Sequence, residues 1–518
     1  MSLGRTPAEE DLFRSTRAAC EARLPEASIF RLLARESHRL FADEAFADLF
    51  TDVGRRSIPP RIVAVVMVLQ RLHGMSDREA VDAFAFDLRW KYAAGALDFD
   101  YPGFVHTVLV DMRERLRRSE RPNRIFEVVL EVANEAGLVG RKRVLDSTAL
   151  YDAVATQDTV TMIRSAIVAL LRLAGEALEA ELGSALSRDD DYQKSGKPKC
   201  DWEDAQAREA LVDALAKDGR ALLARLDDRQ LPAEVKQAAE LLATLLGQDL
   251  ETTEDGRFRI ARRVAENRII STVDPEARHG HKTASRGFDG YKGHVAIDPD
   301  SEIITATEVT AGNVGDAQPA AALAEDVLTK PGEGEPRAEV YGDSSYGTAD
   351  LVERIEGAGG EANVKVQPPS PPKKGMLAQD AFDIDTKNET VRCPAGMLVQ
   401  IRRRDDGSGS AEFGTACDGC ALRERCTTSK QGRSVNVHPK FETLHRSRER
   451  QRDPAWKARY RATRPKVERK IAHLMRRKHG GRRARVRGRL RVAHDFALLA
   501  AAVNLARIAK LRVVAAPA

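Results

Sequence analysis

Long apolar runs are missing from this sequence of 518 residues. No stretch approaches the roughly 20 apolar residues that a membrane-spanning helix needs. The first residues, MSLGRTPAEEDLF, have neither the apolar segment nor the cleavage pattern of a secretory signal. These absences predict a cytoplasmic protein without a membrane partner. With 42% hydrophobic and 31% charged residues, the chain is predicted to be soluble and folded, with about three or four domains or one domain with large insertions.

Acidic residues are scarce in one part of the chain. Between Lys440 and Arg491 there are 21 Lys or Arg and four Asp or Glu, a net charge of +17, although the whole chain carries only +5. So few local acids leave the repulsion among these cations uncompensated, which favours a polyanionic partner. Trp456 and Tyr460 lie among the cations, and nucleic acid is the partner we expect. A solvated helix face is the alternative.

The N-terminal part of the chain has a helical pattern. Over residues 28–135, apolar residues recur at three- and four-residue spacing, as in amphipathic helices. The pair Pro59 and Pro60 precedes one run, and SDRE at residues 76–79 has the form of a capping box before another. We therefore expect an all-α domain over residues 1–138, which could bind nucleic acid, dimerise or simply pack.

Strand and helix patterns alternate further along, which predicts an α/β core. Val144 and Leu145 read as a short strand that ends at Asp146, and two β-rich runs flank a turn at residues 298–301. A helix over residues 317–328, a strand ending at Asp343, a further helix and a last strand follow. The predicted core comprises residues 139–158, 285–367 and 454–514. A largely helical insertion, residues 159–284, and a Cys-bearing insertion, residues 368–453, interrupt it.

Two carboxylates, Asp146 and Asp343, each follow a β-rich run and precede small polar residues. On adjacent strands they would lie close together. Two like charges within a few Å raise each other's pKa unless a cation lies between them, so such a pair either shares a proton or holds a metal ion. Oxygen ligands without a nearby His favour Mg²⁺ or Mn²⁺. Alternatively, Asp146 is a turn or cap residue and Asp343 is a helix N-cap.

Glu468 is the leading candidate for a third carboxylate. It is one of only four acids in the basic segment, and the pattern around it is helical. Three carboxylates beside so basic a segment suit phosphodiester transfer, in which two metal ions roughly 3.5–4 Å apart activate one oxygen and stabilise another. The alternative is a solvated helix charge.

Several motifs together make the chain similar to a known family. VLDSTAL with AVATQDTV, DPEARHGHKTASRGFDGYKGHVAID, VTAGNVGDA with Asn313 and Asp316, YGDSSYGT, RPKVERKIAHL and AAAVNLARIAKL resemble the motifs of bacterial insertion-sequence DDE transposases. The resemblance runs from about residue 28 to residue 512. It implies a ribonuclease H-like catalytic core within the α/β fold.

The resemblance also implies a mechanism and its site. Asp146, Asp343 and Glu468 would form the catalytic triad that holds two Mg²⁺ or Mn²⁺ ions. The enzyme would cut DNA at the terminal inverted repeats of a transposon and join the freed 3′-hydroxyl to target DNA, acting as a homodimer on paired ends. A catalytically silent DNA-binding protein derived from a transposase and a metal-dependent nuclease without strand transfer are the alternatives.

Further residues are expected to contact DNA. Related enzymes carry Tyr, Arg, Glu and Lys at fixed helical spacing; here Arg464 precedes Glu468 by four residues, Tyr460 is one residue out of register, and Met475 stands where the Lys is expected. Arg464 could instead only pair with Glu468, one helical turn later. His294 is expected to pack within a strand rather than act as a ligand or base. The predicted DNA contacts are Lys282, Arg286, Tyr291, Lys292, Tyr460, Arg464, Arg476, Arg477 and Lys478.

Four of the six cysteines lie in the second insertion. Cys393, Cys417, Cys420 and Cys426, in CPAG and CDGCALRERC, resemble a small zinc ribbon or treble clef. Four thiolates satisfy a closed tetrahedral Zn²⁺ site, and disulfides are not expected in a reducing cytoplasm. We predict one structural Zn²⁺ that helps this insertion to fold, with unligated thiols as the alternative.

Overall fold

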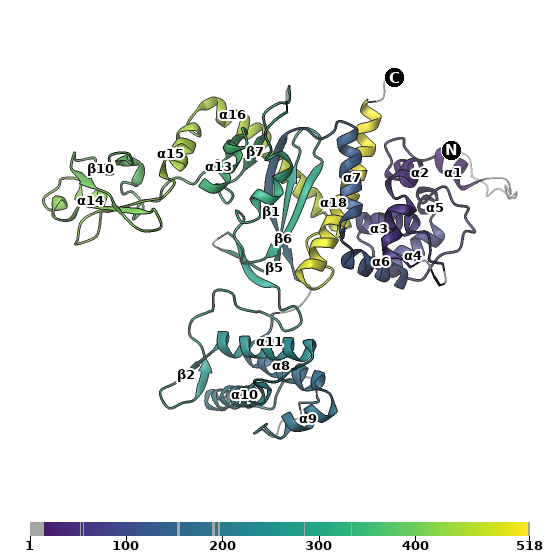
Figure 1. Ribbon diagram of the computed structural model, residues 1–518, viewed down its shortest axis with the longest axis horizontal. Coiled ribbons are helices and arrows are strands. Elements are labelled where there is room, and N and C mark those ends of the chain that lie inside the picture. The colour runs from purple at the N-terminus through teal and green to yellow at the C-terminus, as the bar shows by residue number, and fades with distance from the viewer. Residues whose placement is uncertain are drawn as a thin grey trace, which may run out of the picture.

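The computed structural model describes residues 15–515 except 52, 55, 153–155, 189–191, 195–196, 284 and 333. Residues 153–155 of the AVATQDTV motif lie outside the described residues. Figure 1 shows a central sheet with N-terminal helices on one side, a small β-rich lobe on the other side and a helical lobe below.

The N-terminal region is helical, as predicted. Ser76 and Glu79 form the expected capping box at the start of α4, and Pro60 occupies the first position of α3, where its missing N–H costs nothing. The elements are α1 (Thr16–Glu21), α2 (Ile29–Leu40), a 3₁₀ helix (Asp43–Leu49), α3 (Pro60–His73), α4 (Asp77–Phe86), α5 (Leu88–Ala93), α6 (Thr107–Arg118) and α7 (Arg124–Glu135).

A six-stranded mixed sheet forms the centre of the molecule. Its order is β4-β5-β1-β7-β8, and β6 pairs with the remaining length of β5. The β1–β5, β4–β5 and β5–β6 pairs are antiparallel, whereas β7 is parallel to β1 and to β8. The strands are β1 (Lys142–Tyr151), β4 (Arg278–Thr283), β5 (Arg286–Ile297), β6 (Ile304–Ala311), β7 (Glu339–Gly342) and β8 (Glu361–Val364).

Most of these elements match the prediction, but three differ. The expected hairpin is β5 and β6, and Asp343 directly follows β7. β1, however, continues beyond Asp146 to Tyr151, because β5 pairs with this second half. The helix expected over residues 317–328 is only α12 (Ala320–Leu323) and a 3₁₀ turn, Glu325–Val327. β4, which the sequence predicts to lie within the helical insertion, is part of the central sheet.

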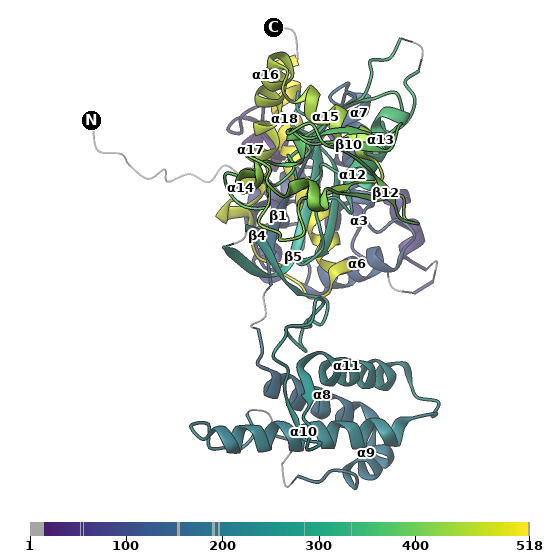
Figure 2. The same ribbon diagram turned by 90° about the vertical axis from the view of Figure 1, so that its left-hand side faces the viewer.

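The helical lobe has a core of its own. The chain leaves the sheet and returns to it at one point, where the N–H of Gln157 donates to the carbonyl of Ile270 (2.9 Å). Figure 2 shows this lobe set apart from the rest of the molecule. Its elements are α8 (Thr159–Ala174), α9 (Glu176–Gly183), α10 (Ala205–Leu226), α11 (Ala233–Asp249), β2 (Leu250–Thr252) and β3 (Phe258–Ile260).

The Cys-bearing lobe is built of short strands around another small core. It follows α13 (Ala349–Gly357) and β8. Its elements are a 3₁₀ turn (Gln379–Ala381), β9 (Asp383–Asp385), β10 (Thr390–Arg392), β11 (Leu398–Gln400), β12 (Arg402–Arg403), β13 (Gly409–Glu412), a 3₁₀ turn (Gly414–Cys417), α14 (Arg423–Cys426) and β14 (Ser434–Val437).

The C-terminal segment returns to the sheet as helices. α15 (Phe441–Arg450), α16 (Pro454–Thr463) and α17 (Pro465–Leu474) lead through a 3₁₀ turn, Arg477–His479, to α18 (Arg489–Ala515). Contrary to the prediction, one stretch, Arg489–Arg512, is long and apolar enough to cross a membrane. It is a core helix, however, because 78% of that apolar window is buried inside the protein.

α18 joins the N-terminal helices to the sheet in one continuous core (Figure 1). On the sheet side, the buried Asn504 amide accepts from the N–H of Ile304 (2.9 Å) and donates to its carbonyl (2.8 Å). On the other side, buried Arg71 of α3 pairs with Asp495 at 3.0 Å. The N-terminal helices therefore share their core with the sheet.

Candidate active site

The register of β1 and β7 brings the two predicted aspartates together. These parallel strands pair from Lys142 opposite Glu339 to Val144 opposite Tyr341. Asp146 lies two residues beyond this pairing on β1, and Asp343 lies two residues beyond it on the other strand. The two aspartates therefore lie at the same height along the two neighbouring chain segments. The N-cap of α13 is Thr348, so the N-cap interpretation of Asp343 is wrong.

α17 packs against β1 and brings the third acid. Arg464, which precedes the helix, contacts all three carboxylates. Its Nη2 lies 3.0 Å from Asp146 Oδ1 and 3.8 Å from Asp343 Oδ2, and its Nη1 lies 3.4 Å from Glu468 Oε1. The expected Arg464–Glu468 pair is thus present, and it is part of a larger cluster that we call the acid cluster: Asp146, Asp343, Glu468 and Arg464.

Exposure rises steadily across the acid cluster. The exposed fraction of the side chain is 8% for Arg464, 15% for Asp146, 41% for Asp343 and 62% for Glu468. The cluster is therefore closed on the side of the sheet and open toward solvent at Glu468. A large substrate could reach it from that side.

Burial dominates the electrostatics of Asp146. It raises the pKa of this carboxyl to about 6, although Arg464 and the N–H of Ser147 act in the opposite direction; nearby Asp343 raises it further. Burial lowers the pKa of Arg464, but Asp146, Tyr460, Asp343 and Glu468 together outweigh it, and the net pKa is raised. One guanidinium therefore does not fully compensate the buried carboxylate.

A further carboxylate, Asp316, lies beside the acid cluster. It accepts from the Ser147 hydroxyl (2.8 Å) and pairs with Lys292 Nζ (2.8 Å), which also donates to the carbonyl of Val314. The sequence places Asp316 in the VTAGNVGDA motif, which by itself predicts no role for this residue. Its contact with the neighbour of Asp146 links that motif to β1.

His294 packs inside the sheet, as predicted. It is fully buried, with Nδ1 3.1 Å from the Tyr346 hydroxyl and Nε2 2.9 Å from the Thr310 hydroxyl. Burial lowers its pKa to about 4. A neutral ring held on both sides is a structural support beneath the acid cluster.

The predicted DNA contacts fall into three groups. Tyr291 is fully buried and donates to Asp274 at 2.7 Å, so its predicted contact with DNA is wrong. Lys292, Tyr460 and Arg464 lie at the acid cluster; the hydroxyl of Tyr460 donates to the carbonyl of Gly342 (3.1 Å). The exposed cations are Lys282 and Arg286 on the strands of the sheet and Arg476, Arg477 and Lys478 after α17.

The four cysteines of the β-rich lobe surround one small cavity of about 20 Å³. All four are free thiols. Burial raises the pKa of Cys426; Arg433 acts in the opposite direction, and the other three thiols raise the pKa further. Across the described ranges of the chain, however, no three His, Cys, Asp or Glu side chains are arranged to hold a metal ion. The zinc site therefore stays a prediction.

Two protein-family models match segments of this chain. The Transposase domain (DUF772) matches residues 18–115, which cover the N-terminal helices, and the Transposase DDE domain matches residues 392–509, which include Glu468. Both matched families are transposase families, and together they support an insertion-sequence DDE transposase. No curated protein and no solved structure matches it.

The two matched segments both contribute to the continuous core. The matched segments contain α3 and most of α18, which pack together, but neither segment contains Asp146 or Asp343. The family implies DNA as the substrate and a nuclease or transposition enzyme.

Proposed function

We propose that this transposase cuts DNA at transposon ends and joins the freed 3′-hydroxyl to target DNA, with Asp146, Asp343 and Glu468 as its catalytic carboxylates. The observation that carries the proposal is that one guanidinium contacts all three acids, from a strand, a strand end and a helix. Such convergence of acids far apart in the sequence is costly unless cations hold them.

The strand order supports a ribonuclease H-like core. Three antiparallel strands, β6-β5-β1, continue into parallel β7 and β8, and helices pack on both faces. The acids then lie on the central strand β1, after the adjacent β7 and on a C-terminal helix. After the N-terminal helices, the domains we propose are this core, which includes β4, the helical insertion from residue 159 up to β4, and the Cys-bearing insertion at residues 368–453.

The donor set fits Mg²⁺ or Mn²⁺. All three side chains offer hard oxygen atoms, and burial raises the pKa of Asp146 although Arg464 acts against it. Two such ions would activate water or a 3′-hydroxyl and stabilise the departing oxygen. Arg464 holds the carboxylates together before any ion binds and is placed to contact a scissile phosphate.

The exposed cations supply the DNA surface. Lys282, Arg286, Arg476, Arg477 and Lys478 contact the backbone in this proposal, and two subunits hold the paired terminal repeats. A structural Zn²⁺ on the four cysteines and a cytoplasmic location remain part of it. Basic groups on mobile side chains bind phosphates without reading sequence.

The test is cleavage and joining of a DNA fragment that carries the flanking repeats of the gene, with Mg²⁺ or with EDTA. Wild type with Mg²⁺ is expected to cut and join, and Asp343→Asn is expected to bind the ends without cutting. Asp350→Asn, an exposed acid seven residues later, is the matched control. Cutting without joining would favour a nuclease, and equal binding without cutting by wild type would favour a silent DNA-binding protein.

A further inference from the structure

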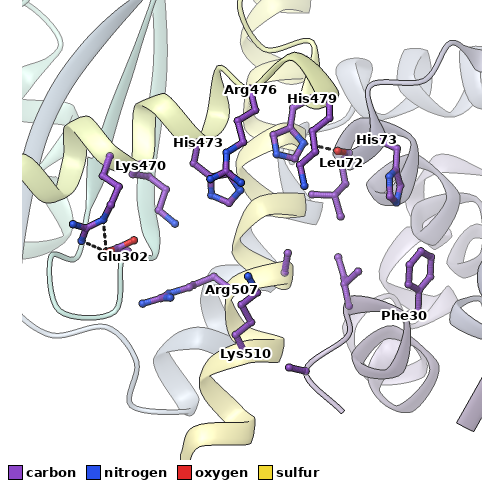
Figure 3. A pocket seen from close by; sticks show the side chains of 15 residues that line it. Phe30, Leu72, His73, Glu302, Lys470, His473, Arg476, His479, Arg507 and Lys510 are labelled. Carbon is purple, nitrogen blue, oxygen red and sulfur yellow. Dashed lines mark hydrogen bonds and ion pairs between the residues drawn. The ribbon is translucent and has the colours of Figure 1, made fainter. Parts of the chain in front are cut away.

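A second strongly charged site lies behind α17. It is a cavity of about 440 Å³ between the N-terminal helices, α17 and α18. Figure 3 shows Lys470, His473 and Arg476 on one side of this cavity and Arg507 and Lys510 of α18 on another, all around one space. Lys470 is two positions after Glu468, about 200° around the helix. The cavity and the acid cluster therefore lie on different faces of α17.

The charge of this cavity is not balanced by the protein. Among the described residues, Glu302 is the one acid that lines the cavity, and it pairs with Arg469. Within the part of the chain that the structure describes, the other five cations form no ion pair. The six lining cations are Arg469, Lys470, Arg476, Lys478, Arg507 and Lys510. Lys470 is buried among them, whereas Arg469, Arg476, Lys478 and Lys510 are exposed. This excess of positive charge around one cavity favours a bound anion.

Two polar groups at the back of the cavity are deeply buried. Lys470 is 2% exposed, and His479 is completely buried. The Nδ1 of His479 donates to the carbonyl of Leu72, and its Nε2 has no hydrogen-bond partner among the described residues. An unpartnered buried nitrogen costs free energy, and because Nδ1 already carries the proton, a hydroxyl group of a ligand would satisfy Nε2 by donating to it.

The remaining wall of the cavity is apolar. Phe30 and Leu72 line it from α2 and α3, with the ring of Phe30 stacked 6.1 Å from that of His73. The volume lies within the roughly 300–1,000 Å³ of small-molecule sites. A DNA duplex is too wide to bring more than its edge to groups as buried as Lys470 and His479. The geometry therefore points to a small ligand.

We propose that this cavity binds a compact polyphosphate, either inorganic or attached to a nucleoside, at a site separate from the acid cluster. The cations of α17 and α18 would hold the phosphates, and the apolar wall formed by Phe30 and Leu72 would contact an apolar group of the ligand. Binding would tie α2 and α3 to the helix that carries Glu468. The inference does not depend on the proposed function, because it needs neither DNA nor a metal ion.

The test is calorimetric titration of the full chain with tripolyphosphate and with adenosine triphosphate, in EDTA and without DNA. Wild type is expected to bind tripolyphosphate and to gain thermal stability from it. The double variant Arg507→Gln/Lys510→Gln is expected to lose roughly tenfold or more in affinity, since a charged hydrogen bond contributes about that factor. Lys510 is exposed, and half-buried Arg507 makes one hydrogen bond, from Nε to the carbonyl of Ser301 (2.8 Å), so the variant should fold.

Arg512→Gln is the matched control. Arg512 is on the same helix, outside the cavity, and pairs with Glu36 at 3.2 Å, so its loss should leave the affinity unchanged. Equal affinities for the two ligands would assign the site to inorganic phosphates, and tighter binding of the nucleotide would assign it to nucleotides. Failure of wild type to bind either ligand, or equal binding by the double variant, overturns the proposal. Loss of DNA binding in that variant without any polyphosphate binding would make the cavity a DNA surface.

Discussion

Arg464 carries the central contacts of the molecule at the scale of single residues. It is the only cation that contacts Asp146, Asp343 and Glu468 among the described residues. In the absence of metal, its positive charge offsets the cost of bringing three carboxylates together. A metal ion at the same acids would take over that role, so the two cations should substitute for each other in stability.

We therefore expect Arg464→Gln to be more sensitive to metal than wild type. Without metal, the variant should lose about 1–3 kcal/mol of unfolding free energy, because buried Asp146 loses its charged partner. Mg²⁺ should restore part of this loss, and its stabilising effect should exceed that on wild type. Thermal unfolding with Mg²⁺ and with EDTA measures both, with exposed Arg461→Gln as the control. An equal effect of Mg²⁺ on all three proteins would contradict this exchange of cations.

His494 gives the protein an acid-sensitive core. Burial lowers its pKa from the ordinary value of 6.5 to about 4. Asp495 acts in the opposite direction, and Arg117 and Arg113 lower the pKa further. Between these two values the unfolded chain binds the proton and the folded chain does not, so stability falls as the pH falls from 6.5 to 4. His494→Gln should remove about 1–3 kcal/mol of this loss. Denaturant unfolding of wild type and His494→Gln at pH 7 and pH 4.5 measures the loss of stability. An equal loss in the two proteins would contradict this role of His494.

At the scale of elements, α18 is the helix on which the core depends. Asn504 replaces a missing strand partner for Ile304 by pairing with both its N–H and its carbonyl. Asn504→Leu should cost about 2–4 kcal/mol, because two buried backbone groups lose their partners. The urea midpoint measures the loss, and Asn388→Leu, at an exposed turn, is the control. A stability within the error of wild type would mean that the pairing contributes little.

The sequence predicted those elements whose local pattern agrees with their packing. The capping box of α4, the β5–β6 hairpin and the strand before Asp343 were visible because turn and cap residues define them. The length of β1 was not, since its second half is a strand only because β5 pairs with it. α18 was not recognised as one long apolar helix because charged residues at both its ends interrupt the apolar run.

The same distinction holds for the acid cluster. The identity of the three acids could be proposed from motifs, but the position of Arg464 between them depends on how α17 packs on β1. Tyr291 was predicted to contact DNA because it lies at the start of the central hairpin, near Lys292. In the fold, strand alternation turns it inward to Asp274, away from its neighbour Lys292.

At the scale of the whole molecule, the parts differ in their independence. The helical lobe has its own core and joins the sheet where Gln157 and Ile270 meet, whereas the N-terminal helices share their core with α18. Replacing residues 159–268 by a short Gly-Ser linker should therefore leave a cooperatively folding protein. Removing residues 1–138 should expose the apolar face of α18 and cause aggregation.

Size-exclusion chromatography and thermal unfolding of the two shortened chains test this difference. Wild type is the reference for the elution volume and for the sharpness of the transition. If the chain without residues 1–138 were monomeric and cooperative, the shared core would not be needed for folding. Aggregation of the chain without the helical lobe would mean that this lobe is not independent.

The central claim is that Asp146, Asp343 and Glu468 act as one catalytic unit, and the rate of strand cleavage at a transposon end tests it most directly. Asp146→Asn, Asp343→Asn, Glu468→Gln and the triple variant are compared with wild type in Mg²⁺. Each single change is expected to cost at least about 100-fold, more than typical losses of outer-shell partners. The triple variant should be no slower than the slowest single variant, because groups that act together are not additive. Losses that multiply across the three positions, or a single variant that cuts at the wild-type rate, would contradict the account.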